Sequence, residues 1–188
     1  MYIDEKVIKA RNEAKKDKYY TIDYELTING NVLSFSKKEL FNSLFSIVLP
    51  DQFIIMDSEV AKTKYPSEFR PKLIYTNENG DVNFTFSYLD SALHASQINT
   101  MIEDLQAIQK RLNPANVFLE TGSIKSVNRN VGFFTFRSYC FDDDIYNTMF
   151  ITNINDLLLL GSFNCMYSQR YSWEPLVKQM IATINDLG

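Results

Sequence analysis

The sequence predicts an α+β fold in which an antiparallel β-sheet is flanked by helices. Three observations point to this class. Several segments alternate apolar and polar residues with the period of a strand. Asn-Gly pairs at 29–30 and 79–80 stand between such segments and mark tight hairpin turns. Two other segments, 98–112 and 172–187, carry apolar residues at the spacing of an amphipathic helix.

The first 18 residues are strongly charged and have only a thin apolar stripe at helical spacing. We therefore expect a charged helix at 1–18 and a single α+β domain at 19–188. No apolar run is long enough for an export signal or a membrane span.

Strands dominate the first half of the predicted domain. We expect them at 20–28, after the Asn29-Gly30 turn at 33–35, at 45–49, at 73–76 and at 82–88. Between Pro50 and Pro71 the periodicity is weak, so this stretch is predicted to be the longest irregular connection. Such connections often carry function.

The second half is predicted as helix, strands, helix. The helix at 98–112 is expected to be capped by Ser96 and ended by Asn113-Pro114. Strands are expected at 117–125, 131–141, 145–152 and 157–165. Because Leu157–Leu160 does not alternate, we expect this last strand to be covered on both faces. Ser172 is the expected cap of the final helix at 172–187.

Composition excludes several classes of function. The chain has one histidine, His94, although histidine is the usual general base near neutral pH and the commonest metal ligand. A net charge of −4 disfavours nucleic-acid binding and adhesion to an anionic membrane. Two cysteines without an export signal are typical of a cytoplasmic protein. No cofactor or metal is expected.

The remaining reactive groups favour structural interpretations. Asp142-Asp143-Asp144 lacks the spacing of a calcium loop and is interpreted as a turn between strands. His94 and Ser91 are close in sequence, but no strained nucleophile turn accompanies them, so His94 is interpreted as structural. Cys140 and Cys165 are expected to be buried, inert thiols; their spacing leaves a disulfide open.

Two strings resemble the PsbP-like superfamily, which includes a photosystem II extrinsic subunit, a Ran-binding nuclear-import factor and DcrB-type bacterial proteins. The first is Leu44-Phe45-Ser46-Ile47-Val48-Leu49-Pro50 with Phe53. The second is the strand 157–165 followed by a helix beginning at Trp173. The resemblance covers about residues 42–188. It implies an α/β/α sandwich and a largely non-enzymatic function, and Asp57-Ser58 is the nearest match to an Asp-x-Ser element of the Ran-binding branch.

Basic and aromatic residues alternate in one segment of the irregular connection, at Lys62, Lys64, Tyr65, Phe69, Arg70 and Lys72. We therefore predict a non-catalytic interaction module that binds a protein partner. Its expected contacts are Asp57, Ser58, Tyr65 and Arg70. Two alternatives remain open. One is a small hydrolase or metal-dependent enzyme that uses carboxylates, and the other is a carrier of a small apolar ligand.

Overall fold

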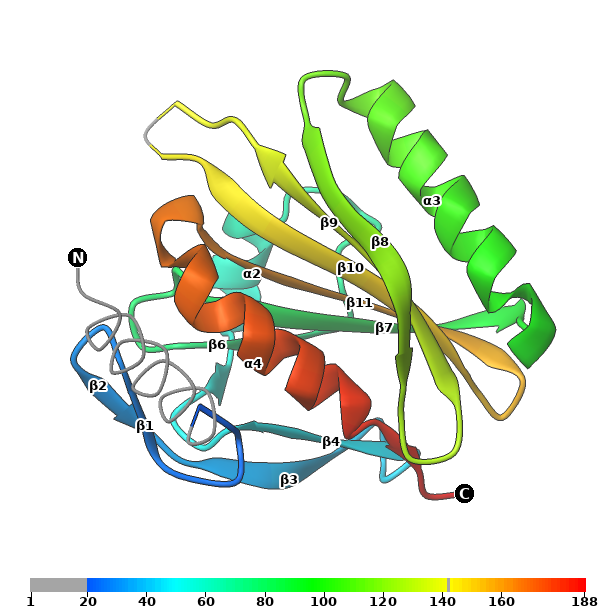
Figure 1. Cartoon of the computed structure of the whole chain (residues 1–188), viewed down its shortest axis with the longest axis horizontal. Coiled ribbons are helices and arrows are strands. Elements are labelled where there is room, and N and C mark those ends of the chain that lie inside the picture. Colours follow the sequence, from blue (N-terminus) through cyan, green and yellow to red (C-terminus); the bar gives the residue numbers. More distant parts are fainter. Residues whose placement is uncertain (1–19, 142) are drawn as a thin grey trace, which may run out of the picture.

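The computed structural model describes residues 20–141 and 143–188 (Figure 1). The helix predicted for 1–18 therefore lies outside the described residues. Within them, the α-helices are α2 (Ser58–Lys64), α3 (Ile98–Leu112) and α4 (Arg170–Ala182). Every strand pairing is antiparallel. The predicted α+β class is confirmed.

A seven-stranded sheet forms the centre of the fold, in the order β5-β6-β7-β11-β10-β9-β8. Its strands are β5 (Ile54–Ile55), β6 (Leu73–Thr76), β7 (Asn83–Ala92), β8 (Val117–Lys125), β9 (Asn130–Ser138), β10 (Ile145–Ile154) and β11 (Leu157–Met166). A three-stranded sheet joins β3 (Phe35–Leu40), β4 (Phe45–Pro50) and β12 (Asn185–Asp186), and a small hairpin joins β1 (Leu26–Ile28) to β2 (Asn31–Leu33).

Helix α3 covers one face of the large sheet, and α4 with the three-stranded sheet covers the other (Figure 1). Side chains alternate between these two cores along each central strand. On β11, Leu158 packs toward α3 whereas Leu159 packs into the core beneath α4. The expectation that Leu157–Leu160 is covered on both faces is thus confirmed.

The predicted tight turn at Asn29-Gly30 is present, and a second turn of similar backbone conformation connects β10 to β11. Asn29 and Gly30 have φ values of 50° and 83°, which suit a type I′ turn between β1 and β2. Asn155 and Asp156 have φ values of 49° and 58° and connect β10 to β11. Asparagine, aspartate and glycine tolerate this left-handed region better than other residues.

The strand predicted for 20–28 is wrong over 20–25. Those residues form turns and bends against α4, and only Leu26–Ile28 is a strand. The backbone N–H of Ile22 donates to Gln179 Oε1 at 3.2 Å, and the Tyr20 hydroxyl donates to the carbonyl oxygen of Ser172 at 2.5 Å. Hydrogen bonds to a distant helix thus replace those of a strand ladder.

The predicted helix boundaries also need correction. Ser96 does not cap α3, because a short 3₁₀ turn η1 (Ala95–Gln97) precedes that helix. Helix α4 follows a similar turn, η2 (Tyr167–Gln169), and therefore begins two residues before Ser172. It ends at Ala182, where Thr183 Oγ1 accepts a hydrogen bond from the Val48 N–H at 2.8 Å. The chain beyond then pairs with β4 instead of continuing the helix.

Candidate protein-binding surface

The connection between β4 and β6 is more ordered than the sequence predicts, because it contains β5 and α2. The local signal for α2, which the sequence analysis missed, is Asp57. Its Oδ1 accepts hydrogen bonds from the N–H groups of Glu59 at 2.8 Å and Val60 at 3.3 Å, which caps α2. These backbone hydrogen bonds lower the pKa of Asp57. The carboxylate is therefore engaged in starting a helix.

Tyr65 ends α2 and anchors it to the large sheet. Its N–H donates to the Ala61 carbonyl oxygen at 2.8 Å, and its hydroxyl accepts from Asn164 Nδ2 on β11 at 3.4 Å. The ring packs on a small core of Met56, Ala61 and Ile74. Burial raises the pKa of Tyr65. The side chain is half-buried, and these contacts give it a structural role.

Ser58 and Arg70 lie together at a groove of about 200 Å³ between α2 and the chain leading to β6. Arg70 is held by its Nε–H, which donates to the Tyr65 carbonyl oxygen at 3.1 Å. Its two Nη groups form no hydrogen bond with the described residues. Neither Asp57 nor Tyr65 lines this groove, so two of the four predicted contacts converge there.

Large apolar side chains are exposed in the same segment of the chain. Ile54 and Ile55 on the edge strand β5 are 59% and 60% exposed, Val60 on α2 is 54% exposed, and Phe69 is 95% exposed. We call these four residues, with Ser58, Lys62, Arg70 and Lys72, the α2 surface. Sequence analysis found its basic residues but missed the exposure of its apolar ones.

The α2 surface also carries positive charge. Lys62 is paired with Glu59, their Nζ and Oε1 atoms being 2.6 Å apart. Arg70 and Lys72 form no ion pair within the described part of the chain. The surface thus combines apolar side chains with available cationic donors, which is the composition of many binding surfaces.

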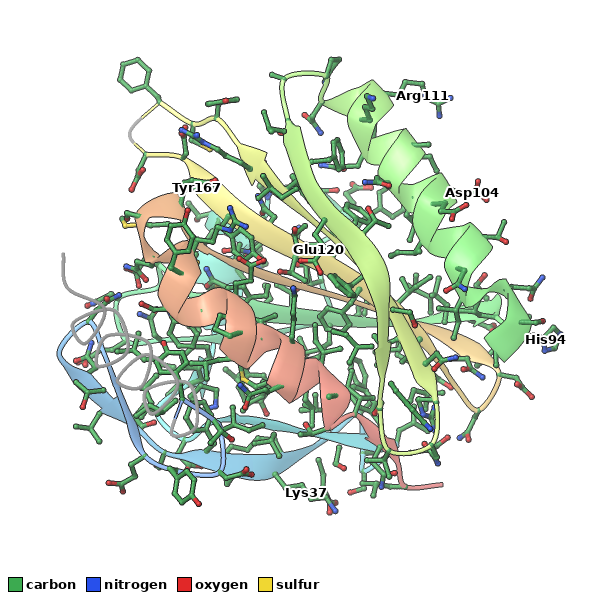
Figure 2. The ribbon with its side chains drawn as sticks, in the orientation of Figure 1. Lys37, His94, Asp104, Arg111, Glu120 and Tyr167 are labelled. Atoms are coloured by element: carbon green, nitrogen blue, oxygen red, sulfur yellow. The ribbon has the colours of Figure 1, made fainter. Side chains whose placement is uncertain are left out.

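The sequence analysis missed a second cluster of aromatic and cationic side chains. The Arg137 guanidinium lies 4.9 Å from the ring centre of Tyr139 and 4.4 Å from that of Tyr167, and Arg170 lies 5.4 Å from that of Tyr171. Figure 2 shows Tyr167 beside the start of α4. Unlike Arg70, both arginines are engaged by acids: Arg137 pairs with Asp144, and Arg170 Nε lies 2.8 Å from Glu174 Oε2.

The predicted turn at Asp142–Asp144 lies between β9 and β10, although Asp142 itself is outside the described residues. In the described part of the chain no group of three or more His, Cys, Asp or Glu side chains could hold a metal. His94 points away from the sheet at the start of α3 (Figure 2). Its backbone N–H donates to Gln97 Oε1 at 3.0 Å, and its imidazole Nδ1 lies 3.9 Å from Asp156 Oδ1.

The two cysteines differ in a way the sequence did not predict. Cys165 is buried as expected, and burial raises the pKa of its thiol. Cys140 is exposed, because β9 ends at Ser138 and leaves it in the loop; the expectation that it is buried is wrong. Both are free thiols.

Among the described carboxylates, each one whose pKa departs from its usual value has a lowered pKa. The Lys38 ammonium and two serine hydroxyls lower the pKa of Asp51 to about 2. Burial alone would raise the pKa of Asp186, but hydrogen bonds led by that from Arg129 lower it overall. A general acid needs the opposite shift. These carboxylates are therefore held ionised by structural partners.

No described helix is both long and apolar enough to cross a membrane.

Comparison with known proteins finds matches among solved structures. No family model and no curated protein matches the chain. The cyanobacterial PsbP protein (CyanoP) of Synechocystis sp. PCC 6803 has a TM-score of 0.60 at 11% identity, covering 84% of this chain and 95% of that one.

Two further matches are structures of Mog1. A mutant of Mog1 has a TM-score of 0.50 at 10% identity, covering 82% of this chain and 96% of that one. Mog1p of Saccharomyces cerevisiae, described as a Ran-binding protein, has a TM-score of 0.48 at 11% identity, with the same coverage. The resemblance expected from the sequence is confirmed at the level of the fold: the chain has the PsbP-like fold.

Proposed function

We propose that residues 19–188 form a single domain that acts as a non-catalytic protein-interaction module, with the α2 surface as its contact. The observation that carries this proposal is the set of four exposed apolar side chains in this segment of the chain, one of which, Ile55, lines a groove with available cationic donors. The predicted contacts Ser58 and Arg70 lie at that groove. Asp57 and Tyr65 contribute by capping α2 and by anchoring it.

Apolar burial supplies the driving force for such an interaction. A fully buried Phe or Ile side chain contributes about 1.5–3 kcal/mol relative to an exposed one. Phe69 is almost fully exposed, so a partner that covered it would gain most of this amount. Aromatic and arginine anchors at the centre of an interface usually carry most of its affinity, and here Phe69 and Arg70 are adjacent.

Charge indicates the chemistry of the partner. Arg70 and Lys72 extend from the groove without acidic partners among the described residues, so an acidic segment of another protein fits there. Free Cys140 and Cys165 support a reducing compartment, and we place the module in the cytoplasm. The carboxylate enzyme would need acids with raised pKa values, for which none of the shifted carboxylates qualifies.

The test is site-specific photo-crosslinking in the native cell. A photo-reactive residue at position 69 is compared with one at position 112, because Leu112 is also well exposed, at 67%, but lies at the end of α3. We expect a discrete protein adduct from position 69 and none from position 112. Equal labelling from both positions, or none from 69, would contradict the placement.

Charge reversal provides the matched control. The double variant Arg70→Glu/Lys72→Glu is expected to abolish the adduct at position 69, while Lys110→Glu/Arg111→Glu on α3 makes the same change in net charge and should leave it intact. Both variants should retain the wild-type unfolding temperature. Loss of the adduct in both would mean that overall charge, and not the α2 surface, governs binding.

A further inference from the structure

The groove on the α2 surface, of about 200 Å³, has a cationic wall. The charged residues that line it in the described chain are all basic, namely Lys62, Arg70 and Lys72. Ser58 adds a hydroxyl group, and the remaining lining is apolar: Ile55, Met56, Ala61, Pro71 and Ile74. The volume is below that of drug-sized pockets. The groove therefore suits one small anionic group with an apolar neighbour.

The acids next to the groove leave two of its cations uncompensated. Glu59 Oε1 lies 2.6 Å from Lys62 Nζ and neutralises that lysine. The Asp57 carboxylate accepts hydrogen bonds from the backbone at the start of α2 and does not line the groove. Arg70 and Lys72 form no ion pair with any residue that the structure describes. The groove thus presents two positive charges to a ligand.

Arg70 is oriented before any ligand binds. Its backbone N–H donates to the Ser67 carbonyl oxygen at 3.1 Å, and its Nε–H donates to the Tyr65 carbonyl oxygen at 3.1 Å. Both Nη groups are accessible to solvent, and neither forms a hydrogen bond within residues 20–141 and 143–188. A guanidinium held at Nε presents its two Nη groups as a fork, which matches two oxygens of one anion. Less side-chain entropy is then lost on binding.

The number of free donors distinguishes a phosphate ester from a carboxylate. The Arg70 fork, the Lys72 ammonium and the Ser58 hydroxyl have no hydrogen-bond partner among the described residues. A carboxylate carries one charge and two oxygens, so it would leave one of the two cations uncompensated. A phosphorylated side chain carries a charge of about −1.5 to −2 at pH 7 and three strong acceptor oxygens. It matches both the charge and the donors of the groove.

We propose that the partner of the α2 surface presents a phosphorylated serine or threonine to this groove, an inference that rests on the function proposed above. The phosphate accepts hydrogen bonds from Arg70, Lys72 and Ser58, and an apolar residue beside the phosphorylated one packs on Ile55. Phe69, which is 95% exposed and precedes Arg70, adds apolar contact. These contacts favour a peptide over a free anion, and the net charge of −4 disfavours the lipid phosphates of a membrane surface.

Peptides on one scaffold test this chemistry. Acetylated and amidated Gly-Leu-X-Leu-Gly carries phosphoserine, glutamate or serine at X, so that X holds the only charge. The ¹H–¹⁵N resonances of residues 58–72 report binding. We expect a saturable shift with the phosphoserine peptide, at a Kd on the order of millimolar, and about tenfold weaker binding of the glutamate peptide. No shift with the phosphoserine peptide, equal affinity for the glutamate peptide, or equal affinity for inorganic phosphate would each overturn the proposal.

Three variants locate the binding. Lys72→Gln removes one of the two charges and no contact that the structure describes, and it should weaken the phosphoserine peptide about tenfold. Arg70→Lys keeps the charge but loses the fork, so weaker binding is expected here too. Arg111→Gln, at the end of α3, makes the same change in charge as Lys72→Gln and should leave the affinity unchanged. Wild-type affinity in both groove variants would overturn the assignment.

Phosphatase treatment separates this inference from the proposed function. Cell extract is treated with a protein phosphatase and then irradiated with protein that carries the photo-reactive residue at position 69. Loss of the adduct, compared with untreated extract, supports a phosphorylated partner. An adduct that persists at full yield overturns this inference and leaves the proposed function standing. Absence of an adduct from untreated extract contradicts the proposed function, and this inference with it.

Discussion

Gly161 lies directly opposite Phe150 in the β10–β11 ladder, and the Phe150 ring fills the space that a side chain at 161 would need. The ring is fully buried. It makes edge-to-face contacts with Phe84 and Phe86, with centroids 5.7 and 6.2 Å apart. Because these neighbours are themselves buried, the ring has nowhere to move. A glycine is therefore required at position 161 by packing, not by backbone conformation.

We expect Gly161→Ala to lower the free energy of unfolding by about 3 kcal/mol, at the upper end of the usual cost of overpacking. The reason is the clash of the new methyl group with the Phe150 ring. Urea titration followed by circular dichroism measures this change. Gly122→Ala is the control, because its methyl group would lie 3.2 Å from the Phe133 ring and needs only a small adjustment. Equal costs for the two variants would contradict this explanation.

Two substitutions of Tyr65 separate its role in anchoring α2 from a role in binding the partner. Tyr65→Phe removes only the long hydrogen bond with Asn164, so we expect a loss of stability below about 1 kcal/mol. Tyr65→Ala also removes the ring that packs on Met56, Ala61 and Ile74, and should cost about 2–3 kcal/mol. Thermal and urea unfolding measure both. If Tyr65→Ala left stability unchanged but abolished the crosslink from position 69, the residue would be a contact instead of an anchor.

The features that the sequence predicted well depend on local chemistry. The Asn29-Gly30 turn, the apolar spacing of α3 and the four strands after it each follow from neighbouring residues. Residues 20–25 alternate like a strand, yet distant hydrogen bonds from α4 satisfy their backbone instead. Helix α2 is short and lies between prolines, so its periodicity was too brief to detect, and its one signal was the capping Asp57.

The candidate sites divide in the same way, into features that follow from neighbouring residues and features that depend on distant ones. Arg70 and Ser58 were predicted from a basic and aromatic stretch that is continuous in sequence. The Arg137–Tyr167 contact joins the end of β9 to a 3₁₀ turn thirty residues later, so no local pattern could reveal it.

The two thiols should react at very different rates. Cys140 is exposed, so a maleimide is expected to label it readily in the folded protein. Cys165 is buried and burial raises its pKa, so it should stay unlabelled until the protein unfolds. Intact-mass spectrometry therefore predicts one adduct under native conditions and two in denaturant. Cys140→Ser should abolish the native adduct; labelling of Cys165 in its place would show that β11 opens readily.

Asp51 should make stability depend on pH in the acid range. Lys38 Nζ lies 2.9 Å from its Oδ1, and hydrogen bonds from Ser34 and Ser36 add to this contact. Together they lower its pKa from 3.8 to about 2. A carboxyl with a lowered folded-state pKa stabilises the fold above its unfolded pKa, and this contribution is lost as the pH falls from about 4 to about 2.

Asp51→Asn is therefore expected to destabilise the protein at pH 7 and to make no difference near pH 2. The side chain is 36% exposed, so solvent screening limits the effect at pH 7 to about 1 kcal/mol or less. Urea titrations of both proteins across this pH range give the comparison. Asp104→Asn, an exposed carboxylate on α3 without a described hydrogen bond, is the control and should follow the wild type (Figure 2). A difference between Asp51→Asn and the wild type that persisted unchanged at pH 2 would show that the contribution of Asp51 is packing and not its charge.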